Sequence, residues 1–175
     1  MRYAVGKGCF LAVAGGNEAT EGNGVEVYAE IASRLQGAVS VAAVDPNRRR
    51  AYYSTTGTWL ELAAPGGSDL VANGYVYQQT YDFSLVETYK LPVSQYRAPR
   101  FDAFAYIGVI GTSMATAHVS GLAALLMQQG LKSPAGIEAA MEKFATDLGV
   151  PGRDSEFGYG EISARNTLFG MGIAR

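Results

Sequence analysis

The sequence predicts an α/β fold, and two kinds of segment lead to this prediction. Short apolar runs that end in turns rich in Gly, Asn or Pro are typical of buried strands, and they lie at about residues 9–14, 38–44 and 58–63. A run from Thr112 to Met127 that is apolar nearly all round, and a second segment near 134–145, are typical of helices. With 175 residues, 48% hydrophobic and 17% charged, the chain can form one sizeable core and does not have a disordered composition.

The first predicted strand holds Cys9, the chain's single cysteine, which can form no internal disulfide and is expected to be a buried small hydrophobe. A long glycine-bearing loop follows it. The second strand ends at Asp45, which we interpret as a turn residue. The arginine run 48–50 predicts a solvated turn and is too short for a nucleic-acid-binding stripe, so no nucleic-acid partner is expected.

Residues 68–109 hold six tyrosines and two prolines but little helical periodicity, which predicts an extended loop with β-like pieces. Two interpretations are open for this loop. It is a surface elaboration packed by its own aromatic rings, or a rim that shapes a substrate groove. The helix near 134–145 has a clear start, because Ser133 is a favoured N-cap and Pro134 suits the first helical position.

Ser113, in "GTSMATAHVSG", lies at or just inside the start of the apolar helix. It is either an N-cap or a nucleophile beside free N–H groups that would stabilise developing negative charge. His118, the chain's one histidine, lies roughly 140° around the helix and about 7.5 Å along it, so it cannot be the base. We expect it to be a hydrogen-bonded core residue. A base for Ser113 would have to come from elsewhere.

The segment "GTSMATAHVSGLAALL" resembles the nucleophile segment of subtilisin-like serine proteases, usually written G-T-S-M-A-x-P-H-V-x-G. Ala117 stands where that family usually has proline, and alanine should fit because a first helical turn accepts either residue. Three further segments match in the family's order, namely "KGCFLAVAGGNEA" (7–19), the stretch from 37 to 67 that ends in "AAPGG", and "KFATDLGVPGRDSEFGYGEISARNTL" (143–168).

The resemblance implies a mostly parallel sheet with flanking helices, and it places residues 1–175 in the C-terminal portion of a subtilisin-like peptidase domain with 68–109 as a long loop insertion. It implies that Ser113 is the nucleophile and that Asn17 donates a hydrogen bond into the oxyanion hole. Ala14, Gly15 and Gly16 would wall the pocket for the side chain before the scissile bond.

The same residues have simpler interpretations. Gly15, Gly16 and Asn17 could form a plain turn, and their spacing does not fit a dinucleotide-binding motif. Glu18 lies at the edge of the implied pocket, where it would favour basic side chains or simply be a solvated surface residue.

In that family the catalytic residues run Asp, His, Ser along the chain, so the resemblance implies that this sequence begins after the first two. We therefore expect the chain to belong to a family of serine endopeptidases. We expect this chain on its own to be nearly inactive. The alternatives are a non-catalytic fragment and a half-enzyme completed by a second chain.

Expectations about ligands and location follow from the same resemblance. A peptide or protein substrate is expected, and the missing N-terminal half or self-association could supply a partner. No cofactor is expected, and the family's common calcium cannot be assigned to residues here. Neither a signal peptide nor an apolar stretch of about 18 residues is recognisable in residues 1–175, so we expect no membrane span within them. Secretion is implied by the resemblance alone.

Overall fold

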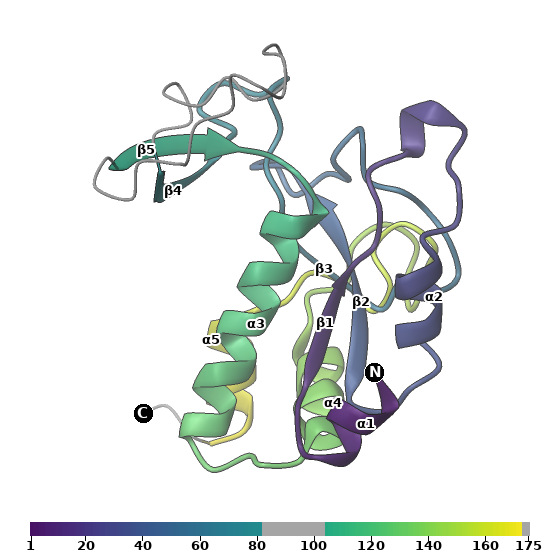
Figure 1. Ribbon diagram of the computed structural model, residues 1–175, viewed down its shortest axis with the longest axis vertical. Helices are drawn as coiled ribbons and strands as arrows, with labels where there is room; N and C mark the ends of the chain where they lie inside the picture. The colour runs from purple at the N-terminus through teal and green to yellow at the C-terminus, as the bar shows by residue number, and fades with distance from the viewer. Residues whose placement is uncertain (82–103, 173–175) are drawn as a thin grey trace, which may run out of the picture.

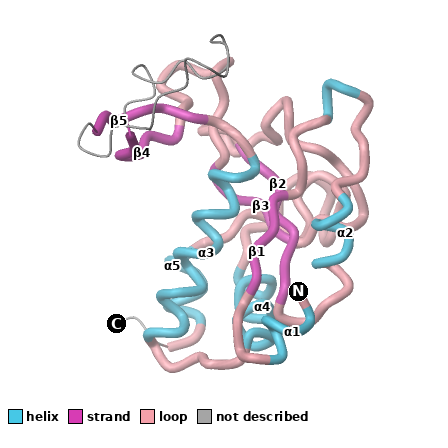
Figure 2. The backbone as a smooth tube through the Cα atoms, in the orientation of Figure 1, coloured by secondary structure: helices cyan, strands magenta, loops and turns pink. Residues whose placement is uncertain are grey.

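The computed structural model describes residues 1–81 and 104–172 (Figures 1 and 2). Its helices are α1 (Arg2–Gly6), α2 (Val27–Ala32), α3 (Thr112–Gln128), α4 (Pro134–Phe144) and α5 (Ala164–Gly170), with a 3-10 turn at Ala19–Glu21. Its strands are β1 (Leu11–Ala14), β2 (Ala38–Val44), β3 (Leu62–Pro65), β4 (Val76–Tyr81) and β5 (Phe104–Val109). Within the described part of the chain, no helix has both the length and the apolar character of a membrane span.

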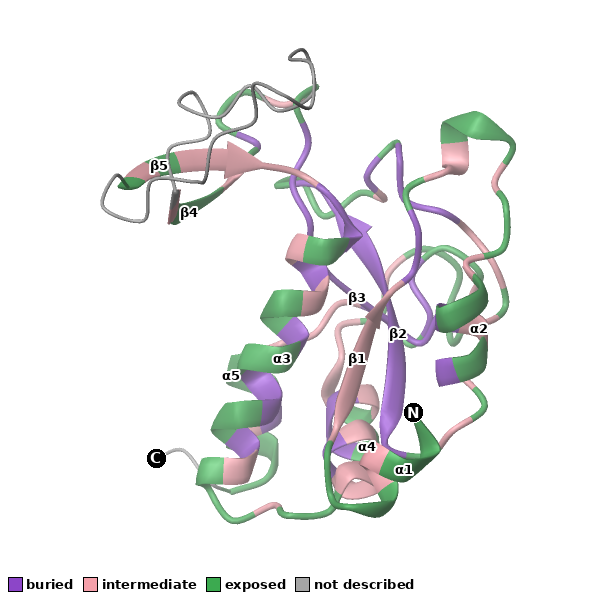
Figure 3. Cartoon of the chain, viewed as in Figure 1, coloured by how far each residue is buried: buried purple, intermediate pink, exposed green. Residues whose placement is uncertain are grey.

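The core lies on a parallel sheet of order β1-β2-β3. All seven residues of β2 are buried, as expected for a central parallel strand that is covered on both faces (Figure 3). Alternate residues of β2 enter different clusters: Val39 and Val41 pack with α3 and α4, whereas Ala42 and Val44 pack with Leu60 and its neighbours. The predicted α/β fold with a mostly parallel sheet is confirmed.

The start of helix α4 agrees with the prediction, whereas the start of helix α3 differs from it. The Ser133 side chain accepts the Gly136 N–H at 3.3 Å and Pro134 occupies the first turn of α4, which confirms the predicted start. The N-cap of α3 is Gly111, so the N-cap interpretation of Ser113 is wrong. Ala117 is the sixth residue of α3, beyond the first turn where it was expected, and its N–H can enter the helical hydrogen-bond pattern that proline would interrupt.

Three local predictions need correction. The expected loop after β1 contains α2, whose start is capped by Glu26 as its side chain accepts the Tyr28 N–H at 3.3 Å. The third strand begins at Leu62 rather than near 58. Cys9 is exposed, because the strand begins only at Leu11 and Cys9 lies in the turn between α1 and β1.

Asp45 is the predicted turn residue after β2: its Oδ1 accepts the N–H groups of Asn47 at 2.8 Å and Arg49 at 2.9 Å. The arginines that follow lie in a solvated turn, as predicted, because Arg48 and Arg49 are exposed and Arg50 is half-buried. Each of them also lies beside a carboxylate. The pairs are Arg48 with Glu161 at 2.5 Å, Arg49 with Asp45 at 3.4 Å, and Arg50 with Glu156 at 3.4 Å.

The segment 68–109 supplies β4 and β5, which pair antiparallel from Val76 with Val109 to Tyr81 with Phe104 and form a second, two-stranded sheet. In Figure 1 this sheet projects from the end of the molecule where α3 begins. The part of the expected loop from 82 to 103 lies outside the described residues. Because β5 runs into the turn before α3, this arm adjoins the start of the serine helix.

Candidate active site

The start of α3 presents Ser113 to solvent. Gly111 has φ 147° and ψ 160°, a backbone conformation that residues with a side chain rarely adopt, and it turns the chain from β5 into the helix. Ser113 is the second residue of α3 and is exposed. Among the described residues, neither its hydroxyl nor its N–H has a hydrogen-bond partner. Both groups are therefore available to a ligand at the positive end of the helix.

Asn17 reaches this helix start from the end of β1. Its Oδ1 accepts the Thr112 N–H at 2.9 Å and the Thr112 hydroxyl at 3.0 Å. Because the amide oxygen is occupied in this way, the Nδ2 group keeps its two donor protons for another acceptor. The structure thus brings Asn17 to the helix start that carries Ser113, through a contact that spans 95 residues and that the plain-turn interpretation does not require.

The residues between β1 and Asn17 are held closely. Ala14 is half-buried and pairs with Val41 in the sheet. A Cβ at Gly15 would lie 2.6 Å from Leu60 Cδ2 and 2.8 Å from the Val41 carbonyl oxygen. Gly16 has φ 110°, and a Cβ there would lie 2.6 Å from Thr55 Oγ1. Glycine is therefore needed at both positions for the chain to reach Asn17.

Glu18 is half-buried and fixes the turn, so the solvated-surface interpretation is wrong. Its Oε2 accepts the Asn17 N–H at 2.7 Å and the Thr55 hydroxyl at 3.2 Å. Hydrogen bonds of this kind to a carboxylate are stronger than neutral ones. Glu18 therefore holds the backbone that carries the Asn17 amide.

His118 is exposed, and the core prediction for it is wrong. Its Nδ1 lies 2.9 Å from the Met114 carbonyl oxygen, and no hydrogen bond joins it to Ser113 in the described part of the chain. It lines an open groove on α3 with mostly apolar neighbours: Pro65, Ala117, Gly121, Leu122, Leu125, Ile162 and Ala164. This outer flank of α3 is not covered by the described residues, which explains why a residue in an apolar run is exposed.

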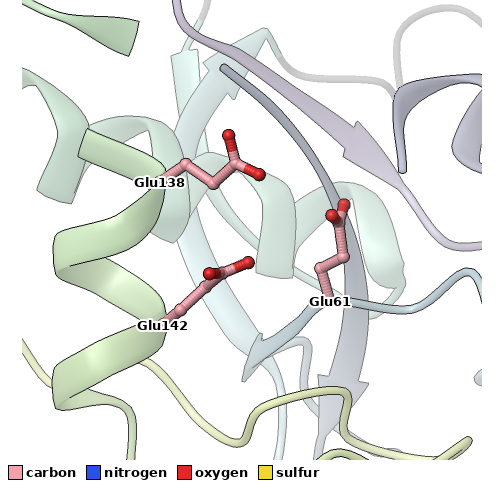
Figure 4. A group of neighbouring side chains, drawn as sticks. All are labelled: Glu61, Glu138 and Glu142. Carbon is pink, nitrogen blue, oxygen red and sulfur yellow. The ribbon is translucent and has the colours of Figure 1, made fainter. Parts of the chain in front are cut away.

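A carboxyl cluster that the sequence reasoning missed lies where β2 and β3 begin (Figure 4), whereas the turn before Ser113 contacts Gly66, just after β3 ends. One oxygen from each of Glu61, Glu138 and Glu142 lies within 4.8 Å of the others. Burial raises the pKa of Glu61 to about 7, against the opposing effect of the Ser40 N–H, which donates to it at 2.9 Å, and Glu138 raises it further. Burial also raises the pKa of Glu138 and that of Glu142. The one available signal was an acidic residue inside the apolar stretch "LELAA".

This cluster does not fit the calcium that is common in the resembling family. Calcium takes six to eight oxygen ligands and favours ionised carboxylates. Glu61 and Glu138 each already accept a backbone N–H, from Ser40 and Gly37 respectively, and the raised pKa values favour the protonated acids. No step of the chemistry below involves a metal.

Comparisons with known proteins give matches over most of the chain. The family model described as "Subtilase family" matches residues 1–160. The chain is 32% identical over 171 residues to a thermophilic serine proteinase from Bacillus sp. (strain AK1), covering 96% of this chain and 33% of that protein. It is 32% identical over 163 residues to the minor extracellular protease Epr from Bacillus subtilis (strain 168), covering 93% of this chain and 20% of that protein.

A solved protease from Pseudoalteromonas arctica PAMC 21717 matches with a TM-score of 0.70 at 26% identity, over 97% of this chain and 44% of that one. The chain therefore spans about a third of the length of the first of these relatives and less than half of the solved protease.

Proposed function

This chain belongs to the subtilase family, and from that premise we propose that it carries the nucleophile and the oxyanion hole of a serine endopeptidase. The observation that supports this most directly is the contact of Asn17 Oδ1 with the Thr112 N–H at 2.9 Å. It leaves the Asn17 Nδ2 group and the Ser113 N–H as two donors without a partner among the described residues, beside one exposed hydroxyl. Two such donors and a nucleophile are what acyl transfer requires.

In the proposed reaction, Ser113 Oγ attacks the carbonyl carbon of the scissile peptide bond while a base removes its proton. The carbonyl oxygen becomes an oxyanion, which accepts hydrogen bonds from Asn17 Nδ2 and the Ser113 N–H. Collapse of this tetrahedral intermediate expels the amine, which takes up a proton, and leaves an acyl ester on Ser113 that water hydrolyses. In subtilisin, loss of the oxyanion-hole asparagine costs about 10²–10³ in turnover, and we assign Asn17 the same role.

Substrate positioning is assigned to the turn before Asn17. Ala14, Gly15 and Gly16 would form the wall of the pocket for the side chain that precedes the scissile bond. Because these residues are small, the pocket would admit a large side chain. The substrate is a peptide or protein, and secretion is proposed because the family relatives include a protease named as extracellular.

The base is proposed to come from a separate portion of polypeptide. His118 is the chain's single histidine, and it bonds to Met114 rather than to Ser113. The uncovered apolar flank of α3, which includes Leu125 at 43% exposure, is a suitable surface for the portion that carries the remaining Asp and His. The alternative that the same observations permit is a non-catalytic module of this fold.

Peptide p-nitroanilide hydrolysis tests the proposal. In subtilisin, loss of the catalytic histidine costs about 10⁶ in turnover, so the chain alone should be slower than a complete protease by a similar factor. Protease-like turnover that Ser113→Ala abolishes would contradict the need for a second portion. The gene sequence upstream of Met1 separates the alternatives, since an in-frame Asp strand and His helix would favour the protease and their absence the non-catalytic module.

A further inference from the structure

A buried tyrosine joins the end of β3 to the turn before Ser113. The Tyr53 side chain is 6% exposed. Its hydroxyl lies 2.8 Å from the Gly66 carbonyl oxygen and 2.9 Å from that of Gly67, and it accepts the Gly111 N–H at 2.9 Å. These three glycines belong to two segments that lie more than forty residues apart in the sequence.

The chemistry of this junction makes the hydroxyl difficult to replace. A phenol has one proton, so it donates to one of the two carbonyls at a time while it accepts from Gly111. The Gly66 carbonyl oxygen has a second donor, because the Gly111 N–H lies 2.9 Å from it. Among the described residues, the Gly67 carbonyl oxygen accepts a hydrogen bond from Tyr53 alone. Loss of the hydroxyl would therefore leave a buried carbonyl without a partner, which is costly.

The two segments also meet closely at Gly66. A Cβ at Gly66 would lie 2.4 Å from Ala43 Cβ and 2.9 Å from the Gly111 carbonyl oxygen. Burial raises the pKa of Tyr53 to about 12, so the hydroxyl stays neutral and keeps its donor proton at working pH. The phenol thus links two backbones that approach closely at Gly66, where a Cβ would not fit.

We propose that Tyr53 is a positioning residue for Ser113. Its hydroxyl fixes Gly111, Gly111 sets where α3 begins, and the Thr112 N–H at that start orients the Asn17 amide. This inference rests on the proposed function, because a fixed turn at Gly111 serves catalysis only if Ser113 is the nucleophile. The rival explanation is that Tyr53 only fills the core, since its ring packs among the buried residues there.

Amide hydrogen exchange measured by NMR distinguishes these explanations. Tyr53→Phe keeps the ring and removes the hydroxyl. We expect exchange at the hydrogen-bonded amides of Gly111 and Thr112 to accelerate about tenfold, and the Asn17 side-chain amide signals to shift, while exchange along β2 is unchanged. Tyr52→Phe is the matched control: its ring contacts that of Tyr53 edge-on, but its hydroxyl interacts with Asp69 rather than with the three glycines, and no change is expected at Gly111 or Thr112.

Two outcomes would overturn the proposal: unchanged exchange at Gly111 and Thr112 in Tyr53→Phe, or an acceleration that is equal along β2, which would show a core-filling role only. The unaltered chain gives an independent measurement if the variant does not fold. There the Tyr53 hydroxyl proton should exchange slowly and show a nuclear Overhauser effect to the Gly111 amide, and its absence would also overturn the proposal.

The exchange result does not depend on chemistry at Ser113, so the two proposals fail separately. Unchanged exchange in a chain whose Ser113 is reactive overturns the positioning role alone. If exchange responds to Tyr53→Phe but Ser113 is unreactive, the proposed function is overturned. The role of Tyr53 would then be structural rather than catalytic.

Discussion

The carboxyl group of Glu61 should make the protein less stable as the pH rises. Its folded pKa is about 7 against an ordinary 4.5, because it is buried beside two other acids. Between these values the folded chain binds more protons than the unfolded chain, so the free energy of unfolding falls with increasing pH. The stabilising effect of the protonated acid is complete below about pH 4.5 and is lost above about pH 7. Glu138 and Glu142 act in the same direction.

The size of the effect follows from the two pKa values. At about 1.4 kcal/mol per pH unit, the window between them corresponds to about 3 kcal/mol for Glu61 alone. Glu61→Gln removes the titration but keeps a side-chain oxygen for the Ser40 N–H. We therefore expect the free energy of unfolding to increase by only about 0.7 kcal/mol at pH 5 and by about 3 kcal/mol at pH 8.

Urea unfolding at pH 5, 6, 7 and 8 measures these differences. The matched control is Glu21→Gln, on the exposed 3-10 turn, which should change the free energy of unfolding by less than about 0.5 kcal/mol at every pH. A free energy of unfolding that increases from pH 5 to pH 8 in the unaltered chain would refute the reasoning. So would a Glu61→Gln variant that is less stable than the unaltered chain at pH 8.

Further predictions concern α3 and α4. Gly111→Ala should lower the free energy of unfolding by about 1–2 kcal/mol because φ 147° disfavours a side chain, and an unchanged melting temperature would contradict this. Ser133→Ala should cost about 1 kcal/mol in the same assay by removing the cap of α4, and no loss would show that the cap contributes nothing. The chain should self-associate through the uncovered flank of α3, and Leu125→Gln should weaken this in sedimentation velocity; a monomeric unaltered chain would rule it out.

Local sequence patterns predicted the helices and strands whose characteristic residues all lie within a short stretch of the sequence. The apolar run of β2, the apolar helix α3 and the Ser133–Pro134 start of α4 were all found in this way. The helix α2 was missed because it is only six residues long and its cap is Glu26, a residue type that is not a usual N-cap.

Exposure was harder to predict, because it depends on what covers each face. Cys9 and His118 both lie in apolar stretches, yet one precedes an edge strand and the other is on the open flank of α3. The burial of Glu61 depends likewise on α4, which comes more than seventy residues later. The contact of Asn17 with Thr112 spans 95 residues, so no local pattern could reveal it, and only the family resemblance indicated it.

Labelling with an alkyl fluorophosphonate at pH 9 tests the central claim most directly. Ser113 Oγ would attack phosphorus, fluoride would leave and the hydroxyl proton would pass to hydroxide, which replaces the absent base. The phosphoryl oxygen would occupy the place of the oxyanion. We expect one adduct at Ser113 by peptide mass spectrometry, none in Ser113→Ala, and labelling about 10²-fold slower in Asn17→Ala. Ser120, exposed on the same helix but bonded to Thr116, should remain unlabelled. Equal labelling of Ser113 and Ser120, or a rate that Asn17→Ala leaves unchanged, would contradict the assignment of Ser113 and Asn17.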